Sequence, residues 1–521
     1  MRRRSFRSVV FAIVVGMLLL VVAAGCAPAS APAAAPPAAP AAESAAPAAG
    51  SGAPVATAAS RPDLSGELVL NTWRDIGADP NHPNYSFHQL VQQWAANHPD
   101  VTVTYQPMLG TVPEIFGYIS TNLRSGTLAD GVVMLYPSPA QMDVDLQYDF
   151  APDLAQPNPY STNPTWKDDF PLDGIALAGV TTQDKVLMVS PTYVGDLGDG
   201  AQLFNQEILD TAGVTALPQT WTEFVDTLAK IKAAGFDPMY MPTAGNESYI
   251  FGWQTGIWSD QLLGDVVTAC DGQAGEPADE RISQIEAVWC LKTGEWSSED
   301  MRPVFELVME MSPYFHEGYL APPPPGDLFS QGKVAFRWLS RLNVGVLAAD
   351  PNITFPWGSF YQPALTEGGQ QVRYGQAGAG AGGQYLFIPQ TAVDNGKLDL
   401  ALDLAQYVTS PASNEFWCTL QPVPCFEPGS TIEEIFPDDP VKQERWRGFV
   451  EPGALNTRFS GLDINNAFGP ANAVEEVKVY QDYLGGTTTL DQALEAWQRL
   501  ADQLAENAIM QHPEWNAESW Q

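Results

Sequence analysis

The chain has 521 residues, of which 61 are acidic and 25 are lysine or arginine, so its formal net charge at pH 7 is −36. A field of this sign repels polyanions, which excludes nucleic acid and anionic lipid as partners. We interpret the acidic surface as a solubility feature, with adaptation to acid or salt as the alternative. The part from residue 63 to residue 521 is too long for one hydrophobic core and predicts two domains.

The first 25 residues have the pattern of an export signal. Four arginines between residues 2 and 7 precede an apolar run over residues 9–24. The run is shorter than the roughly 20 residues of a membrane span. It ends in Ala23-Ala24-Gly25-Cys26, which resembles the lipobox of bacterial lipoproteins although Ala23 replaces the usual leucine. We expect residues 1–25 to be a signal peptide and Cys26 to carry a lipid; the alternative is a plain signal peptide with a chance cysteine.

A spacer follows the predicted lipidation site. Residues 27–59 are almost entirely Ala, Pro, Ser and Gly, and Glu43 is their only charged residue. Such a segment has too little apolar bulk to fold, and its prolines favour an extended, semi-stiff chain. We therefore expect residues 26–62 to tether a globular body to the outer face of the cytoplasmic membrane. No later stretch of the sequence is apolar enough to span a bilayer.

Four cysteines remain for the body, and an even number in an oxidising compartment indicates disulfides. Three pairings are open, of which the local one, Cys270–Cys290 with Cys418–Cys425, is the simplest. Neither pair has the spacing of zinc ligands, and the five histidines form no metal pattern, so we expect no metal. The H-E-x-x-H, G-x-S-x-G and P-loop motifs are absent from the sequence, which argues against an enzyme and against a cofactor.

The body opens with alternating strands and helices. Residues 68–70 predict a buried strand, residues 87–94 an amphipathic helix, and residues 101–105 a half-buried strand. A helix over 115–123 and an apolar strand over 132–135 follow. This order predicts an α/β fold with a parallel sheet covered by helices on both faces. Ligands bind beyond the carboxyl ends of such strands, which here are residues 73–75, 106–108 and 136–138.

The middle of the chain predicts a well-capped helix. Thr220 and Glu223 form a capping box. The apolar stripe that follows consists of Trp221, Phe224, Val225, Leu228 and Ile231. Gly235 then provides a stop signal.

Five segments in order resemble the family-1 extracellular solute-binding proteins of ABC sugar importers, to which maltose-binding-protein-like lipoproteins belong. They are LFNQEILDTAGV (203–214), LPQTWTEFVDTLAKIKAAGFDPMYM (217–241), LFSQGKVAFRW (328–338), GGQYLFIPQTAVDNGKLDLALDLAQYVTSPASNEFW (382–417) and TTTLDQALEAWQRLADQLAEN (487–507). Residues 262–301 have no counterpart in that family and predict an insertion stapled by Cys270–Cys290.

The resemblance implies the periplasmic-binding-protein fold, in which two lobes joined by a hinge close on a solute held between them. It places lobe one at 63–190 plus 352–425 and lobe two at 191–351 plus 426–521. It also implies a monomer that binds a sugar or oligosaccharide and passes it to the permease subunits of an ABC importer.

The resemblance also implies a set of solute-binding residues. They are Trp73, Asp75, Tyr136, Glu247, Tyr249, Trp253, Trp338, Arg341, Gly383 and Phe468. The family's G-x-W after the lysine of F-x-x-G-K is replaced by Ser340-Arg341-Leu342, so Trp338 or Arg341 is expected to take over its role. Each aromatic residue can instead belong to the core, and Gly383 can be part of a plain turn.

Three alternative functions are compatible with the same sequence features. A secreted carbohydrate-active enzyme would need a carboxylate pair, which so acidic a chain offers by chance. A sensor for a membrane kinase would use the same binding fold with another partner. The solute can also be a polyol, a phosphodiester or a polyamine, although the negative charge disfavours an anion.

Overall fold

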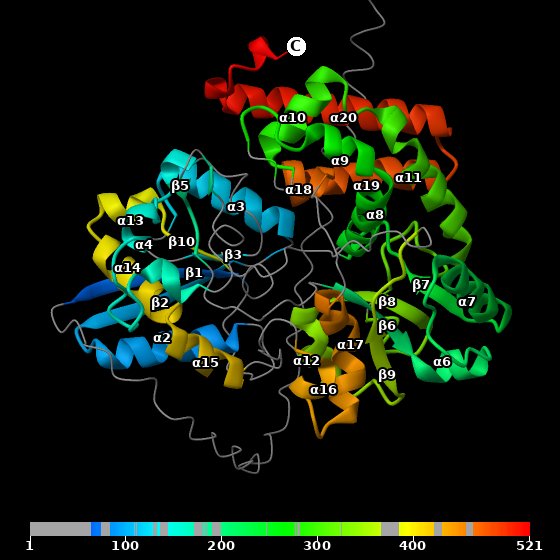
Figure 1. Ribbon diagram of the computed structural model, residues 1–521, viewed down its shortest axis with the longest axis horizontal. Helices are drawn as coiled ribbons and strands as arrows, with labels where there is room; N and C mark the ends of the chain where they lie inside the picture. Colours follow the sequence, from blue (N-terminus) through cyan, green and yellow to red (C-terminus); the bar gives the residue numbers. More distant parts are fainter. Residues whose placement is uncertain are drawn as a thin grey trace, which may run out of the picture. The chain divides into compact units, whose positions relative to one another are not determined.

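The computed structural model describes residues 64–73, 84–108, 110, 112–128, 133–135, 144–170, 181–182, 185–189, 200–245, 247–276, 278, 282–324, 326–365, 385–420, 430–454 and 462–520. Two four-stranded sheets with their helices make up most of this part (Figure 1). The predicted signal peptide, the predicted lipidation site Cys26 and the predicted tether lie outside the described residues, as does Cys425. Within the described ranges, no helix combines the length and the apolarity needed to cross a bilayer.

The first sheet confirms the predicted alternation at the start of the body. Its strands, in order across the sheet, are β10 (Tyr385–Phe387), β3 (Val133–Leu135), β1 (Gly66–Trp73) and β2 (Val101–Met108). Strand β1 runs parallel to both β2 and β3, whereas β10 pairs antiparallel with β3. The sheet is therefore parallel over β3, β1 and β2. Strand β10, which comes from a distant part of the chain, is antiparallel.

Helices cover both faces of the first sheet, with α2 (Tyr85–Asn97) on one side and α3 (Val112–Ser125) on the other (Figure 1). The predicted stripe of α2 is fully buried, as Phe87, Leu90, Val91 and Trp94 all have no exposed surface. Helices α14 (Leu398–Val408) and α15 (Pro411–Leu420) pack against α2. Shorter elements complete this body, namely α4 (Ala151–Leu154), β4 (Thr181–Thr182), β5 (Lys185–Val186) and α13 (Gln390–Asp394).

One buried carboxylate holds these helices together. Asp403 of α14 accepts hydrogen bonds from Trp94 Nε1 at 2.8 Å and from Tyr160 Oη at 2.6 Å. The Nε2 atom of His98, also buried, lies 3.6 Å from the same carboxylate oxygen. A buried charge is tolerated only when it is hydrogen-bonded, so this network fixes the position of α14 on α2.

The second sheet has the order β7 (Asp237–Tyr240), β8 (Val334–Ser340), β6 (Gly200–Asn205) and β9 (Trp357–Phe360). Strand β6 pairs antiparallel with β8 and β9, and β7 runs parallel to β8. The predicted boundary at residue 352 assigned β9 to lobe one, whereas its hydrogen bonds run to β6. The chain therefore leaves the second sheet after β9, and it enters the first sheet at β10.

The helices around the second sheet follow from local signals. Helix α7 (Trp221–Ala233) begins at the predicted capping box, in which the Glu223 amide donates to Thr220 Oγ1 at 3.2 Å. Helix α17 (Pro440–Ala454) packs on β9 and β6. A Cβ at Gly448 would come within 2.6 Å of the Phe360 backbone, so only glycine allows this close approach. Further helices are α6 (Gln206–Thr211), α8 (Ser248–Leu262), α11 (Ser298–Met311), α12 (Val344–Ala348) and α16 (Ile432–Ile435).

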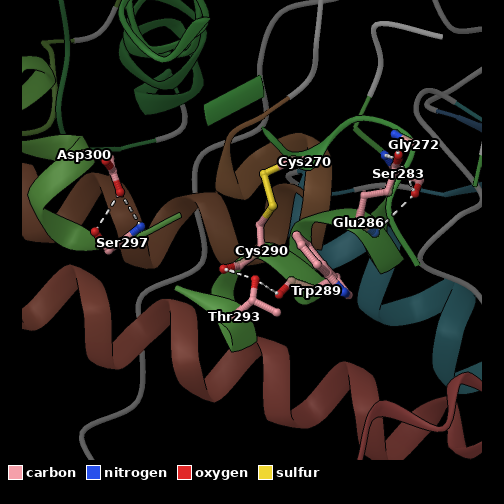
Figure 2. Close-up of a disulfide and its surroundings, with 9 residues drawn as sticks. All are labelled: Cys270, Gly272, Ser283, Glu286, Trp289, Cys290, Thr293, Ser297 and Asp300. Carbon is pink, nitrogen blue, oxygen red and sulfur yellow. Dashed lines mark hydrogen bonds between the residues drawn. A yellow bond between two sulfur atoms is a disulfide. The ribbon is translucent and has the colours of Figure 1, made fainter. Parts of the chain in front are cut away.

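The predicted insertion folds into two helices, α9 (Gly264–Cys270) and α10 (Gln284–Thr293), joined by the Cys270–Cys290 disulfide (Figure 2). This disulfide confirms one of the two predicted pairs, whereas Cys418–Cys425 stays a prediction. Glu286 closes the intervening loop by accepting hydrogen bonds from the amides of Gly272 and Ser283, at 2.7 and 2.8 Å (Figure 2). Helix α10 packs against α20 (Leu490–Gln511) and α18 (Ile464–Phe468).

Candidate functional site

The head of helix α8 brings together three of the predicted solute-binding residues. Strand β7 ends at Tyr240, and the chain then turns into α8, with Glu247 at the N-cap position. Tyr249 and Trp253 follow within the first two turns of the helix. The helix therefore starts close beyond the carboxyl end of a strand, which is where α/β proteins bind their ligands.

A buried arginine holds the Glu247 carboxylate. Arg337 of β8 donates from Nη2 to Glu247 Oε1 at 2.9 Å, and its Nη1 makes an ion pair with Asp327. The hydroxyl of Tyr240 donates to Glu247 Oε2. Arg337 also lies over the Tyr240 ring, 5.5 Å from its centroid. Both oxygens of Glu247 are thus held by protein donors.

The charges of this cluster follow from its burial. The side chain of Arg337 is only 8% exposed, compared with 19% for Asp327 and 29% for Glu247. Burial alone would lower the pKa of Arg337, but the charges of Asp327 and Glu247 outweigh it and raise the pKa above its usual value. The pKa of Tyr240 is raised by burial and by its hydrogen bond to Glu247, so the phenol stays a donor.

Two aromatic residues follow Glu247 in the first turns of α8, and the first of them, Tyr249, interacts electrostatically with Arg337. The rings of Tyr249 and Trp253 are 4.6 Å apart between centroids and inclined by 62°. Tyr249 is 39% exposed. An exposed aromatic residue and a partly exposed carboxylate on the same helix end suit a ligand that has an apolar face and hydrogen-bond donors at its edge.

A neutral histidine lies beneath the cluster. The ring of His316 is 4.8 Å from that of Tyr240, and its Nδ1 accepts a hydrogen bond from the Met241 amide at 3.1 Å. Burial lowers the pKa of His316 to about 4. The imidazole is therefore uncharged at neutral pH and acts as a packing partner of Tyr240.

Three buried glutamines connect α8 to its surroundings. Gln202 of β6 donates to Gln254 of α8 at 2.7 Å, and Gln254 donates to Gln362 at 2.5 Å. Farther along α8, Gln261 accepts from the Leu365 amide at 2.7 Å. Residues 361–365 form the start of the chain crossing from β9 to the first sheet, so this crossing is fastened directly to α8.

Three of the other predicted residues, Trp338, Arg341 and Phe468, lie in the described part of the chain, and all three are buried. Trp338 is buried against Gly200, where a Cβ would come within 2.6 Å of the indole ring. Arg341 and Phe468 are also buried, and Phe468 packs in the helical core with Ile464. Solute contact stays a prediction for these three residues. Asp75, Tyr136, Gly383 and the side chain of Trp73 lie outside the described residues.

Sequence reasoning missed Arg337, Asp327 and Tyr240, which hold Glu247 in place. One signal was available, because an arginine in the middle of the apolar strand VAFRWLS is rarely buried without a charged partner. The partner itself could not be found, since Glu247 lies 90 residues earlier in the chain. In the described part of the chain, no group of three or more His, Cys, Asp or Glu side chains is arranged to hold a metal ion.

Solved structures with the same fold include several solute-binding proteins. Maltose-bound MalE3 of T. maritima is 16% identical with a TM-score of 0.56, over 84% of this chain and 99% of that one. The sugar-binding protein MalE of Xanthomonas citri is 15% identical with a TM-score of 0.57, over 87% and 100%. A sugar transporter of Bacillus licheniformis in complex with stachyose is 13% identical with a TM-score of 0.54, over 84% and 100%. No curated protein sequence matches the chain significantly.

The sequence profile of the bacterial extracellular solute-binding proteins matches residues 78–415. Proteins of this family bind small-molecule solutes outside the cytoplasm and are not enzymes. Their two-lobed α/β fold is the one that the two sheets and their helices form here. The chain therefore belongs to the family of bacterial extracellular solute-binding proteins.

Proposed function

We propose that this protein captures a sugar or oligosaccharide and delivers it to the permease subunits of an ABC importer. The observation that carries the proposal is the head of α8, where the partly exposed Glu247 carboxylate stands at the N-cap and the Tyr249–Trp253 ring pair follows in the first two turns. Sugar rings have an apolar C–H face and hydroxyl donors at their edges, so aromatic plates next to a carboxylate suit them. The maltose and stachyose complexes among the structural neighbours support the same solute class.

In this proposal, the aromatic pair stacks on the sugar and Glu247 accepts its hydroxyls. A carboxylate oxygen has more than one acceptor position, so the bonds from Arg337 and Tyr240 leave capacity for the solute. Trp73, the last residue of β1, and Asp75, two residues later, would contact the solute from the other lobe. A solute that touches both lobes stabilises the closed form only through these shared contacts.

Glu247→Gln and Trp253→Ala should each weaken sugar binding roughly tenfold to a hundredfold, because a charge-assisted hydrogen bond or a stacking face is lost. Calorimetry with maltose, stachyose and D-galactose would measure the affinity. Glutamine is chosen because its amide oxygen can still accept from Arg337 while its NH2 group can donate to the Tyr240 hydroxyl oxygen, so the unliganded fold should be kept.

Trp515→Ala is a matched control, since Trp515 is also a partly buried tryptophan stacked on a neighbouring ring, His512, at 4.3 Å. It should bind sugar like the parent. Parental affinity in both site variants would mean that the solute binds elsewhere. The absence of binding by the parent to any of the three sugars would contradict the proposed solute class.

We also propose that Cys26 carries the lipid that anchors the protein to the membrane. Cys26→Ser should therefore move the protein from the membrane fraction to the medium, as measured by immunoblotting of fractionated cells. Ser30→Ala, a similarly small change in the tether, should stay in the membrane fraction. Retention of the Cys26→Ser variant in the membrane would contradict a lipid anchor at this residue.

A further inference from the structure

Two protein donors fix the position of the Glu247 carboxylate. One oxygen receives Arg337 Nη2 at 2.9 Å, and the other receives the Tyr240 hydroxyl. Glu247 is also the N-cap residue of the 15-residue helix α8, whose dipole favours a negative charge at this end. Its orientation is thus set by two donors, while 29% of its side chain stays exposed.

Arg337 is fixed in turn by a second carboxylate. Its Nη1 pairs with Asp327, whose other contacts tie it to its own turn through the Phe329 amide at 3.0 Å and the Ser330 hydroxyl at 2.9 Å. Burying an arginine between two carboxylates carries a large desolvation cost, and an apolar side chain often stabilises a fold as well. The arrangement therefore calls for a role beyond stability.

We propose that Arg337 is a positioning residue for solute recognition, which acts on the solute only through Glu247. The inference rests on the proposed function of the α8 site. Arg337 is 8% exposed, and its guanidinium already serves Asp327 and Glu247 while one face lies over Tyr240. Of the two carboxylates that Arg337 binds, Glu247 is the more exposed, and it stands at the N-cap of the helix that carries Tyr249 and Trp253. The site accordingly selects groups that donate hydrogen bonds, such as sugar hydroxyls.

A double-mutant cycle on sugar affinity tests this role. Arg337→Met, Glu247→Gln and the combined variant would be titrated with maltose and stachyose by calorimetry. Arg337→Met should weaken sugar binding roughly tenfold in the parent, because Glu247 loses the charge-assisted hydrogen bond that holds its carboxylate in place for the solute. In the Glu247→Gln background, the same change should weaken binding less than about threefold, because the residue through which Arg337 acts is already altered.

Arg302→Met is the matched control, since Arg302 also bridges two carboxylates, Glu299 at 2.9 Å and Asp491 at 3.2 Å. It should bind sugar like the parent. If Arg337→Met lowers the melting temperature of the unliganded protein, Arg337→Lys replaces it in the cycle, because lysine keeps the charge but cannot bond both carboxylates in the same way.

An equal loss of affinity in both Glu247 backgrounds would overturn the proposal, as would parental affinity in both Arg337 variants. Such results would leave the sugar-binding function intact. The absence of maltose and stachyose binding in the parent would instead overturn the proposed solute class and this inference with it.

Discussion

Replacing Glu476 with glutamine should stabilise the protein at pH 8 by several kcal/mol and change its stability little at pH 5. Glu476 lies on α19 (Pro470–Leu484), buried in the helical part of the second body. Its Oε1 accepts a hydrogen bond from Trp497 Nε1 at 2.9 Å, and Asp463 lies nearby. Burial raises the pKa of Glu476 to about 8, the Trp497 bond lowers it in part, and the charge of Asp463 raises it further.

The direction of the effect follows from proton linkage. In the unfolded chain Glu476 loses its proton near pH 4.5, whereas the folded protein keeps it up to about pH 8. The free energy of unfolding therefore falls as pH rises through this interval, by about 1.4 kcal/mol per unit and on the order of 4 kcal/mol in total. Glutamine has the same shape and an amide donor, and it does not titrate.

Urea denaturation at several pH values between 5 and 8 would measure this difference. The exposed neighbour Glu475 provides the control, since Glu475→Gln removes the same charge from the same helix. Its profile should run parallel to that of the parent. A parallel profile for Glu476→Gln as well would mean that this carboxyl group is not the source of the pH dependence.

Removing the Cys270–Cys290 disulfide should lower the free energy of unfolding by about 3 kcal/mol, because the unfolded chain regains the freedom of a loop of some 20 residues. The variant is Cys270→Ala with Cys290→Ala, and denaturation with urea under oxidising conditions gives the value. Both cysteines are buried, so the disulfide lies inside the contact between α9 and α10.

Sugar affinity of this variant should stay at the parental value, because α10 of the insertion packs against α18 and α20. An unchanged denaturation midpoint would show that α9 and α10 hold together without the covalent bond. A loss of sugar affinity with an intact fold would place the insertion in the binding site.

The elements that sequence predicted best are those that depend on neighbouring residues. The capping box of Thr220 and Glu223 defines the start of α7, and the stripe around Trp94 defines the buried face of α2. The Cys270–Cys290 pair is also local. Each of these signals lies within about 20 residues, where spacing alone determines which side chains can meet.

The features that sequence reasoning missed depend on distant pairings. Arg337 meets Glu247 only because β8 lies next to β7, and β9 joins the second sheet through β6. Glu476 belongs to an amphipathic helix, where a glutamate is usually exposed, yet packing of α19 on α20 buries it. Such contacts are set by the topology of the sheets and helices, which periodicity does not encode.

The glutamine chain has a mechanical consequence for solute capture. Gln254 and Gln261 attach the chain crossing at residues 361–365 to the helix that bears Glu247, Tyr249 and Trp253. Residues 362 and 365 are therefore tied to α8 at two points along the helix. In the proposed site, Glu247, Tyr249 and Trp253 would keep their mutual arrangement when a solute binds, so little of the binding free energy would go into ordering them.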